Sequence, residues 1–485
     1  AYEIRLSLVG SEMCIRDSLD ILEKLSPDEF KEFSDYLNSP LFNKRKIIPE
    51  LLDIYKKYYP HFDDTGFAKE KIFSKLFPKK IYNDTVFRNL NSILLSHAEN
   101  FLSLKNYLKN PVLKNIHLLS ELNSKNIFSL FEKNFKESLT FLDKSEIRDS
   151  EFFLNEYNLY IQKDLYNSFI NKFSKKDITM SGLSFMKFYI MKLMEIQNYI
   201  LYECRILGID NSLFIDADYV DKTLKIMPES IRNMPQVKIY YNALMLERKQ
   251  NEKYYKELKS LVFKYGNLLD REKLYNKYID LIDFIKRTRE KNDLGSVKEI
   301  FLLRKRIVEN GLMPENFITN MFFLNLVTSA LRLGEFKWTS DFIDQYNRHL
   351  LPDHRESVRD LSYAMYYFSI KDFQTALSFS AKVRYEDNYY NLQIKNLTAR
   401  IYYELNETDL LINHIASYRM YLSKNRTLSK KEISSHSAFV SFIDKLYKVK
   451  EQKKFHKLDD IISKADNSDF ISRNWILEKV SEMNV

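Results

Sequence analysis

Histidines are the residues of this chain that most readily suggest catalysis or metal binding, and their spacing argues against both. His97 lies in an apolar helical pattern, but Asn100 and Phe101 occupy the positions where a second ligand or a nucleophile would be needed. His349 and His354 are five residues apart across a proline, a spacing that does not place two imidazoles on one helix face. We therefore expect His97 to be a packed, hydrogen-bonded histidine, and the other two to lie in a connecting loop.

Paired acids could also bind a metal ion, and a cysteine could take part in catalysis. Asp63-Asp64 and Asp459-Asp460 could bind a divalent cation, but adjacent acids on a helix point apart, and no oxygen-rich loop surrounds them. Cys204 has no histidine near it in the sequence, which predicts a small core residue. The sequence therefore predicts no catalytic residue, no metal and no cofactor, and we expect a protein that is not an enzyme. An all-helical enzyme with a site assembled from distant residues stays open.

Basic clusters are better candidates for binding a partner. They are Lys44-Arg45-Lys46, Lys79-Lys80, Arg304-Lys305-Arg306 and a longer run of lysines at 448, 450, 453, 454 and 457. Such residues could follow a phosphate backbone while tyrosines and phenylalanines stack on bases. However, acids alternate with these bases, and 75 bases against 66 acids leave a net charge of only +9 over 485 residues. Nucleic-acid binding is therefore the alternative interpretation rather than the leading one.

The elements that must position these residues are helices. The chain has 8 glycines and 10 prolines, whereas an average glycine usage of about 7% would give roughly 34 glycines. Folds with phosphate-binding loops need more glycine, so this composition disfavours an α/β enzyme. No segment alternates apolar and polar residues over the length of a strand, and the apolar runs are far shorter than the roughly 20 residues of a membrane helix. We predict a soluble, all-α protein.

Local signals mark the first helices. Ser26-Pro27-Asp28-Glu29 forms a capping box with proline at the first helical position. A heptad pattern between Asn83 and Asn110-Pro111 predicts one long helix, whose seam is Phe87, Leu90, Leu94, His97, Phe101, Leu104 and Leu108. Further helical stretches are expected near residues 44–59, 112–145, 150–173, 182–206, 217–227, 235–265 and 270–310.

Two parts of the amino-terminal region carry resemblances. Residues 25–30 and 36–43 are similar to the start of a family of uncharacterised, all-helical proteins of Bacteroidetes-type bacteria. That resemblance implies a cytoplasmic helical protein without an assigned activity. Residues 1–18 resemble a translated sequencing-adapter peptide, so we expect them not to be biological. A signal peptide is the alternative, but charged residues interrupt its apolar core.

Three short segments in the last third of the chain recur at nearly fixed spacing. Gly334-Glu335-Phe336, Lys371-Asp372-Phe373 and Asn406-Glu407-Thr408 each separate two helical patterns, and they begin 37 and 35 residues apart. A period near 35 predicts a stacked array of helix-turn-helix pairs, because one pair cannot bury its apolar face alone.

Small and aromatic residues around these turns resemble those of tetratricopeptide units. Ala364 and Tyr367 precede the second turn, Ala376 follows it, and Ala399 and Tyr402 precede the third. The resemblance implies an irregular α-solenoid with a partner groove on the first helix of each pair. The groove residues that it implies are Met321, Leu324, Thr328, Leu331 and Arg332; Val358, Leu361, Met365 and Phe368; and Gln393, Asn396, Arg400 and Tyr403.

This implied surface is largely apolar, with two arginines. It departs from the Lys and Asn clamp with which that family binds chaperone tails, which disfavours such a partner. An apolar groove suits an amphipathic helix or a neighbouring helix of the same chain, so the groove could be open or self-filled.

The sequence predicts an all-α fold in which an N-terminal helical bundle precedes an irregular tetratricopeptide-like α-solenoid. The expected segments are a leader at 1–18, an N-terminal helical domain at 19–110, middle helical hairpins at 111–315, repeats at 316–425 and capping helices at 426–485. The leading functional hypothesis is a non-catalytic, cytoplasmic scaffold that binds a protein or peptide partner and no membrane. A nucleic-acid-binding helical protein is the alternative.

Overall fold

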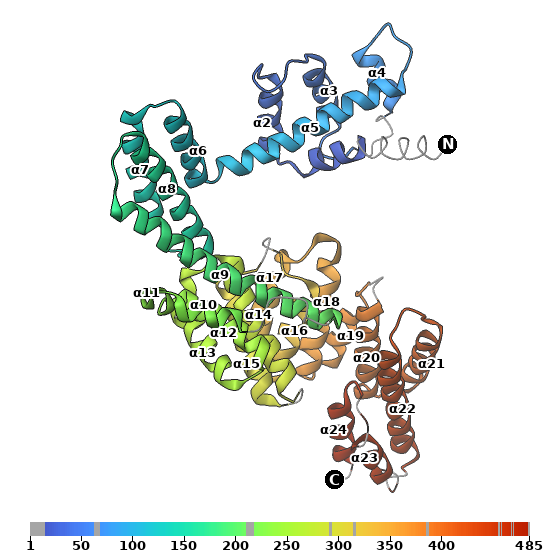
Figure 1. Ribbon diagram of the computed structural model, residues 1–485. Coiled ribbons are helices and arrows are strands. Elements are labelled where there is room, and N and C mark those ends of the chain that lie inside the picture. The colour runs from blue at the N-terminus through green and yellow to red at the C-terminus, as the bar shows by residue number, and fades with distance from the viewer. Residues whose placement is uncertain are drawn as a thin grey trace. The chain divides into compact units, whose positions relative to one another are not determined.

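The computed structural model describes residues 15–62, 68–209, 218–290, 293–313, 317–384, 388–453, 456, 458–466, 468 and 470–483 (Figure 1). These residues form α-helices joined by turns and short 3₁₀ segments, and no strand occurs among them. The predicted all-α class is therefore confirmed. Most of the predicted leader, Asp63-Asp64, Lys454 and Lys457 lie outside the described residues.

Two compact units make up the chain. The first contains Ala1–Ser145 and Glu151–Phe185, and the second contains Glu146–Ser150 and Met186–Val485. This division is coarser than the five segments expected from the sequence, which stay predictions. No described helix is both long enough and apolar enough to cross a bilayer.

The first unit is built on one long helix, α5. Its helices are a segment at 15–24, α2 (Pro27–Asn38), α3 (Ile47–Tyr55), α4 (Lys69–Leu76), α5 (Asp84–Leu108), α6 (Pro111–Ser124), α7 (Phe128–Asp143), α8 (Ser150–Phe169) and the start of α9 (Lys175–Leu207). A core of large side chains, including Phe33, Tyr55 and Phe87, joins the early helices to α5. The α6, α7 and α8 helices lie beside one another (Figure 1), with the Phe131 ring stacked 4.4 Å from that of Tyr166.

The capping box of α2 is confirmed. The Glu29 amide donates to Ser26 Oγ at 3.2 Å, and the Ser26 amide donates to the Glu29 carboxylate at 3.0 Å. The seam of α5 is confirmed only in part, because Leu108 is 54% exposed whereas Asn91 and Ala98 are buried. Burial thus follows the 3.6-residue period of a straight helix rather than the 3.5-residue heptad.

The second unit consists of helices, and from α11 to α24 each helix contacts the next one in the chain. They are the rest of α9, α10 (Tyr219–Ile226), α11 (Glu229–Arg232), α12 (Pro235–Lys249), α13 (Glu252–Tyr265), α14 (Arg271–Thr288), α15 (Leu294–Glu309), α16 (Asn320–Arg332), α17 (Phe336–Tyr346), α18 (Arg355–Ser369), α19 (Phe373–Ser380), α20 (Asn388–Glu404), α21 (Thr408–Lys424), α22 (Lys430–Gln452), α23 (Leu458–Asp466) and α24 (Arg473–Met483). Several of the stretches expected from the sequence are in fact pairs of helices: 112–145, 235–265 and 270–310 each contain two.

The three recurring segments all form the same turn. Gly334, Lys371 and Asn406 adopt positive φ values of 74°, 66° and 57°. In each turn the next residue's amide donates to the carbonyl five residues before it, at 3.0, 2.9 and 3.0 Å. This is the Schellman bond that ends a helix and satisfies its last carbonyls. The predicted turn positions are therefore confirmed.

Small buried residues lie on the first helices of three successive pairs, and these helices contact one another. α16 contacts α18, and α18 contacts α20. Ala330, Ala364 and Ala399 are fully buried at these helices. A methyl side chain lets two helix backbones come close, so the exposed sides of α16, α18 and α20 are held near one another.

Candidate functional site

A pocket of about 790 Å³ lies along the first helices of three successive pairs. We call it the arginine pocket. Its described lining is Thr328, Leu331 and Arg332 from α16, Met365, Phe368 and Ser369 at α18, Gln393, Asn396, Leu397 and Arg400 from α20, and Ser468 with Phe470–Asn474 around the start of α24.

The α20 helix contributes most directly to the pocket, because its residue spacing creates two distinct faces. Gln393, Asn396, Leu397 and Arg400 follow the i, i+3, i+4, i+7 pattern and share one face. The small Ala399 turns instead into the carboxyl-terminal core, where it is fully buried. Packing of that apolar face orients the polar face toward the pocket.

Arg400 is the most unusual residue of this face. Its guanidinium carbon lies 4.7 Å from the centre of the Phe368 ring, a cation–π contact. Its Nε atom is buried without a hydrogen bond to any residue that the structure describes. Desolvation lowers the pKa of Arg400 to about 10. A buried donor of this kind costs free energy until a partner satisfies it.

The carboxylate one helical turn from Arg400 is engaged elsewhere. Glu404 Oε1 accepts a hydrogen bond from the Trp475 indole at 2.9 Å and an ion pair from Lys479 Nζ at 2.9 Å. These contacts fasten α24 onto α20. Glu404 therefore stabilises the wall of the pocket, while the Arg400 guanidinium keeps an unsatisfied donor.

Asn396 presents a second unsatisfied donor on the same helix face. Its side chain is 2% exposed, and its Oδ1 accepts a hydrogen bond from Ser472 Oγ at 2.9 Å. The Nδ2 atom is buried without a described partner. Exchanging the amide oxygen and nitrogen would leave an unsatisfied acceptor in place of this donor, so the assignment of a donor depends on Ser472 Oγ donating its proton to Asn396. Ser472 has a φ of 59°, so a residue in a sparsely populated backbone conformation orients this amide.

Positive charge and apolar surface meet in the pocket. Arg332 and Arg473 both line it. Arg332 is exposed, and Arg473 Nε donates a 2.7 Å hydrogen bond to the Ala465 carbonyl. With Arg400 these make three arginines, and no acid occurs among the described lining residues. Met365 and Phe368 supply apolar surface next to them. The arrangement can accept an anionic group whose neighbours are apolar.

Comparison of the chain with protein-family models, with curated proteins and with solved structures gave no match in any of the three. The resemblances to a helical bacterial family and to tetratricopeptide units therefore stay predictions.

Five of the seven principal groove residues expected from the sequence meet in the pocket. They are Arg332, Met365, Phe368, Asn396 and Arg400, and three of the neighbours that were expected beside them, Thr328, Leu331 and Gln393, lie there too.

The other two principal residues require correction. Leu361 is fully buried in the core, and Tyr403 is 5% exposed. The Tyr403 ring packs edge-on against Trp475 at 5.3 Å. Each lies on the buried side of its helix, so neither lines the groove.

Sequence reasoning missed the wall formed by Ser472 and Arg473. These residues start α24 and lie far from α20 in the chain, although Ser472 bonds to Asn396. Helical periodicity carries no information on which distant turn covers a groove. The only available signal was a polar serine before a helical segment, a common helix start.

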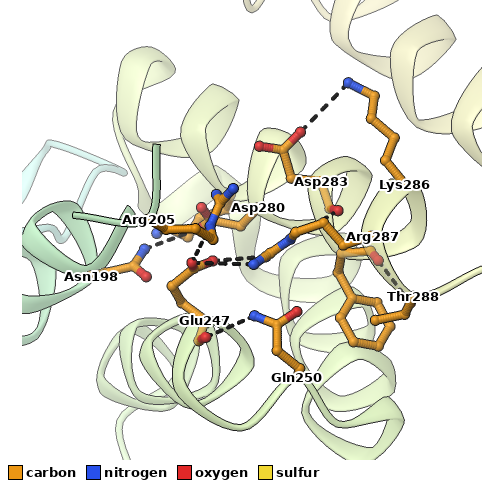
Figure 2. Close-up of polar contacts among 11 residues, drawn as sticks. Asn198, Arg205, Glu247, Gln250, Asp280, Asp283, Lys286, Arg287 and Thr288 are labelled. Atoms are coloured by element: carbon orange, nitrogen blue, oxygen red, sulfur yellow. Dashed lines mark hydrogen bonds and ion pairs between the residues drawn. The ribbon is translucent and has the colours of Figure 1, made fainter. Parts of the chain in front are cut away.

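A polar cluster around Glu247 joins the end of α9 to α12 and α14 (Figure 2). The Glu247 carboxylate bonds to Arg205 Nε at 2.7 Å and to Arg287 at 2.8 and 3.2 Å. Nearby, Asn198 donates to Asp280 at 3.3 Å. The Glu247 carboxylate thus already has positively charged partners on two helices, so this cluster stabilises packing and offers no open site.

Glu299 is satisfied in a similar way. Its carboxylate bonds to Lys259 and Arg289 and accepts the Tyr255 hydroxyl at 2.6 Å. Desolvation raises the pKa of Glu299, but hydrogen bonds from Lys259, Tyr255 and Arg289 outweigh it and lower the pKa to about 2. This cluster ties α13 to α15.

The isolated histidines and the cysteine lie mostly where the sequence placed them. His349 and His354 occupy the connection between α17 and α18, and Cys204 is buried, as predicted. His97 is half-buried, with its ring 6.2 Å from that of Tyr36. It packs as expected, but the predicted hydrogen bond is not formed with any described residue.

In the second unit, side chains of the basic clusters already contact acids and aromatic rings. Arg304 is 8% exposed, Lys305 lies 3.7 Å from Glu309, and Arg306 covers the Phe263 ring at 4.2 Å. Lys448 pairs with Asp444 at 3.1 Å. Across the described part of the chain, no group of three or more His, Cys, Asp or Glu residues is placed to hold a metal ion.

Proposed function

We propose that this protein is a non-catalytic, cytoplasmic helical-repeat scaffold that binds a protein or peptide partner in the arginine pocket. The helix pairs of the second unit would form an irregular, tetratricopeptide-like α-solenoid. Repeated turns at Gly334, Lys371 and Asn406, together with contacts between successive first helices, support this architecture. In such arrays the first helices present a continuous binding face.

The unsatisfied donors of Arg400 and Asn396 carry the proposal. A protein interior avoids buried polar atoms without partners, because each costs about 1–3 kcal/mol. Both donors belong to residues of α20 that line a pocket of about 790 Å³, and they are explained if a ligand supplies the missing acceptors. The volume is within the usual range of ligand pockets.

Photo-crosslinking from the pocket tests the proposal. Met365 lines the pocket, whereas Met420 on α21 is 52% exposed and does not line it. Each would be replaced by p-benzoylphenylalanine in separate full-length proteins, which are then irradiated in native lysate. We expect protease-sensitive, nuclease-resistant adducts of defined mass from position 365 that are absent from position 420.

Nuclease-sensitive adducts from position 365 would instead support the nucleic-acid alternative. The Arg304-Lys305-Arg306 cluster gives that alternative little support, because its side chains are buried or already contact an acid or an aromatic ring. Adduct patterns that are the same at both positions would contradict a binding role for the pocket.

A further inference from the structure

We infer that the arginine pocket recognises an acidic peptide segment of its partner, in which a Glu or Asp carboxylate lies between apolar side chains. This inference rests on the proposed function and names the chemistry of the ligand. It concerns the anchoring of one carboxylate by Arg400 and Asn396, with the exposed Arg332 supplying additional positive charge.

Donor geometry favours a carboxylate. Asn396 and Arg400 are four residues apart on α20, so their unsatisfied Nδ2 and Nε donors lie on one helix face. A carboxylate has two oxygens with several lone pairs and can accept from both donors at once. Hydrogen bonds to a charged acceptor are also stronger than neutral ones, particularly away from water.

Charge complementarity also favours an acidic ligand. The pocket gathers three arginines, and no acid of its described lining compensates the Arg400 guanidinium. The nearest carboxylate on α20, that of Glu404, is held by Trp475 and Lys479. A basic or neutral peptide would leave the Arg400 guanidinium desolvated and uncompensated, whereas an acidic one would neutralise it.

Apolar surface beside the arginines specifies the neighbours of the carboxylate. Met365 and Phe368 from α18, and Phe470 from the turn before α24, line the same pocket. Phe470 is fixed by stacking 4.6 Å from Phe442, and the following amide of Ile471 donates to Ser435 Oγ at 3.0 Å. The turn before α24 is therefore anchored as a wall of the pocket and does not act as its occupant.

Selection from a random library tests the inference on the full-length protein. Random twelve-residue peptides displayed on phage would be selected against the wild type, Arg400→Met and Arg426→Met. Arg426 is exposed in the connection before α22 and lies outside the pocket, so it is the matched control. We expect wild type and Arg426→Met to enrich peptides with Glu or Asp next to Leu, Ile or Phe, and Arg400→Met to lose them.

A selected peptide then gives a quantitative measurement by fluorescence polarisation. We expect Kd to rise at least tenfold when its acid is changed to the amide, and at least tenfold with Arg400→Met. Arg332→Gln changes an exposed side chain and is expected to raise Kd about threefold without affecting folding. A labelled oligouridylate is measured in parallel and should bind equally weakly to wild type and Arg400→Met.

The outcomes separate the inference from the proposed function. Enrichment of basic or neutral peptides that depends on Arg400 would overturn the acidic ligand but keep a peptide-binding pocket. Oligouridylate binding that is lost with Arg400→Met would overturn both. If no peptide is enriched over Arg400→Met, the inference fails, and crosslinking from position 365 decides the proposed function independently.

Discussion

Removing the Arg400 charge should make the protein more stable. The guanidinium is partly buried, stacks on Phe368 and has an Nε donor that no described residue accepts. Arg400→Met keeps an unbranched, apolar side chain of similar length and deletes the buried charge. A residue that only supported the fold would be expected to do the opposite when truncated.

The expected gain can be worked out from the structure. Burial lowers the pKa of Arg400 to about 10, which corresponds to roughly 3 kcal/mol against the charged form at about 1.4 kcal/mol per tenfold change. Partial exposure of the side chain reduces this cost through solvent screening. The contact with Phe368 offsets about 1 kcal/mol more. We expect Arg400→Met to raise the free energy of unfolding by about 1 kcal/mol.

Urea unfolding followed by tryptophan fluorescence measures this change in the relevant region. The chain has two tryptophans, Trp338 on α17 and Trp475 on α24, and both belong to the second unit. The slope of the free energy against urea should stay the same while the midpoint rises. Arg426→Met should change the free energy by less than about 0.5 kcal/mol. A loss of more than 1 kcal/mol in Arg400→Met would show that the guanidinium is paired in the native protein and would refute the reasoning.

Three other predictions test the structure away from the pocket. Glu247→Gln weakens the charge bridge between two arginines and should cost about 2 kcal/mol, whereas the exposed Glu309→Gln should cost under about 0.5 kcal/mol; urea unfolding compares them. Burial lowers the pKa of His436 to about 4, so stability should be constant above about pH 6.5 and fall by roughly 3 kcal/mol toward pH 4. His436→Gln should lose most of that dependence in urea titrations across this range, and the remainder comes from His414 and His97, whose pKa values burial also lowers. Gly334→Ala should destabilise the protein by about 1 kcal/mol because φ is positive at this residue, and Lys371→Gly should stabilise it by up to about 1 kcal/mol. Thermal melts in which both variants shift the melting temperature in the same direction would contradict this.

Helix ends were predictable where residue type revealed the turn and obscure elsewhere. The spaced turns at Gly334, Lys371 and Asn406 stood out because they recur with a period. The break after α6 occurs at Asn126 with φ 54°, and the break after α12 occurs at Gln250 with φ 48°. Each break depends on a single residue within a strongly helical sequence. Glutamine in particular does not usually signal a left-handed conformation. Low glycine content therefore indicated helices correctly but concealed how often they end.

The binding face could be predicted only as far as helical periodicity reaches. Residues spaced three or four apart, such as Asn396 and Arg400, share a face whatever the tertiary structure. Which side of that face is buried depends on the neighbouring helices. Leu361 and Tyr403 were misplaced for this reason, since one is in the core and the other packs under Trp475. The third arginine, Arg473, comes from a distant turn that no periodicity could connect to α20.

Three departures from good packing lie together at α20 and the turn before α24. Arg400 and Asn396 each keep a buried donor without a described partner, and Ser472, which bonds to Asn396, has a positive φ. Each of these three features alone lowers the stability of the fold, and their occurrence together calls for an explanation. Proteins keep such conflicts mainly where function requires them, because substitutions that remove the conflict are readily available. At position 400 a methionine would remove the conflict, and under the proposed function a bound anion accounts for the arginine.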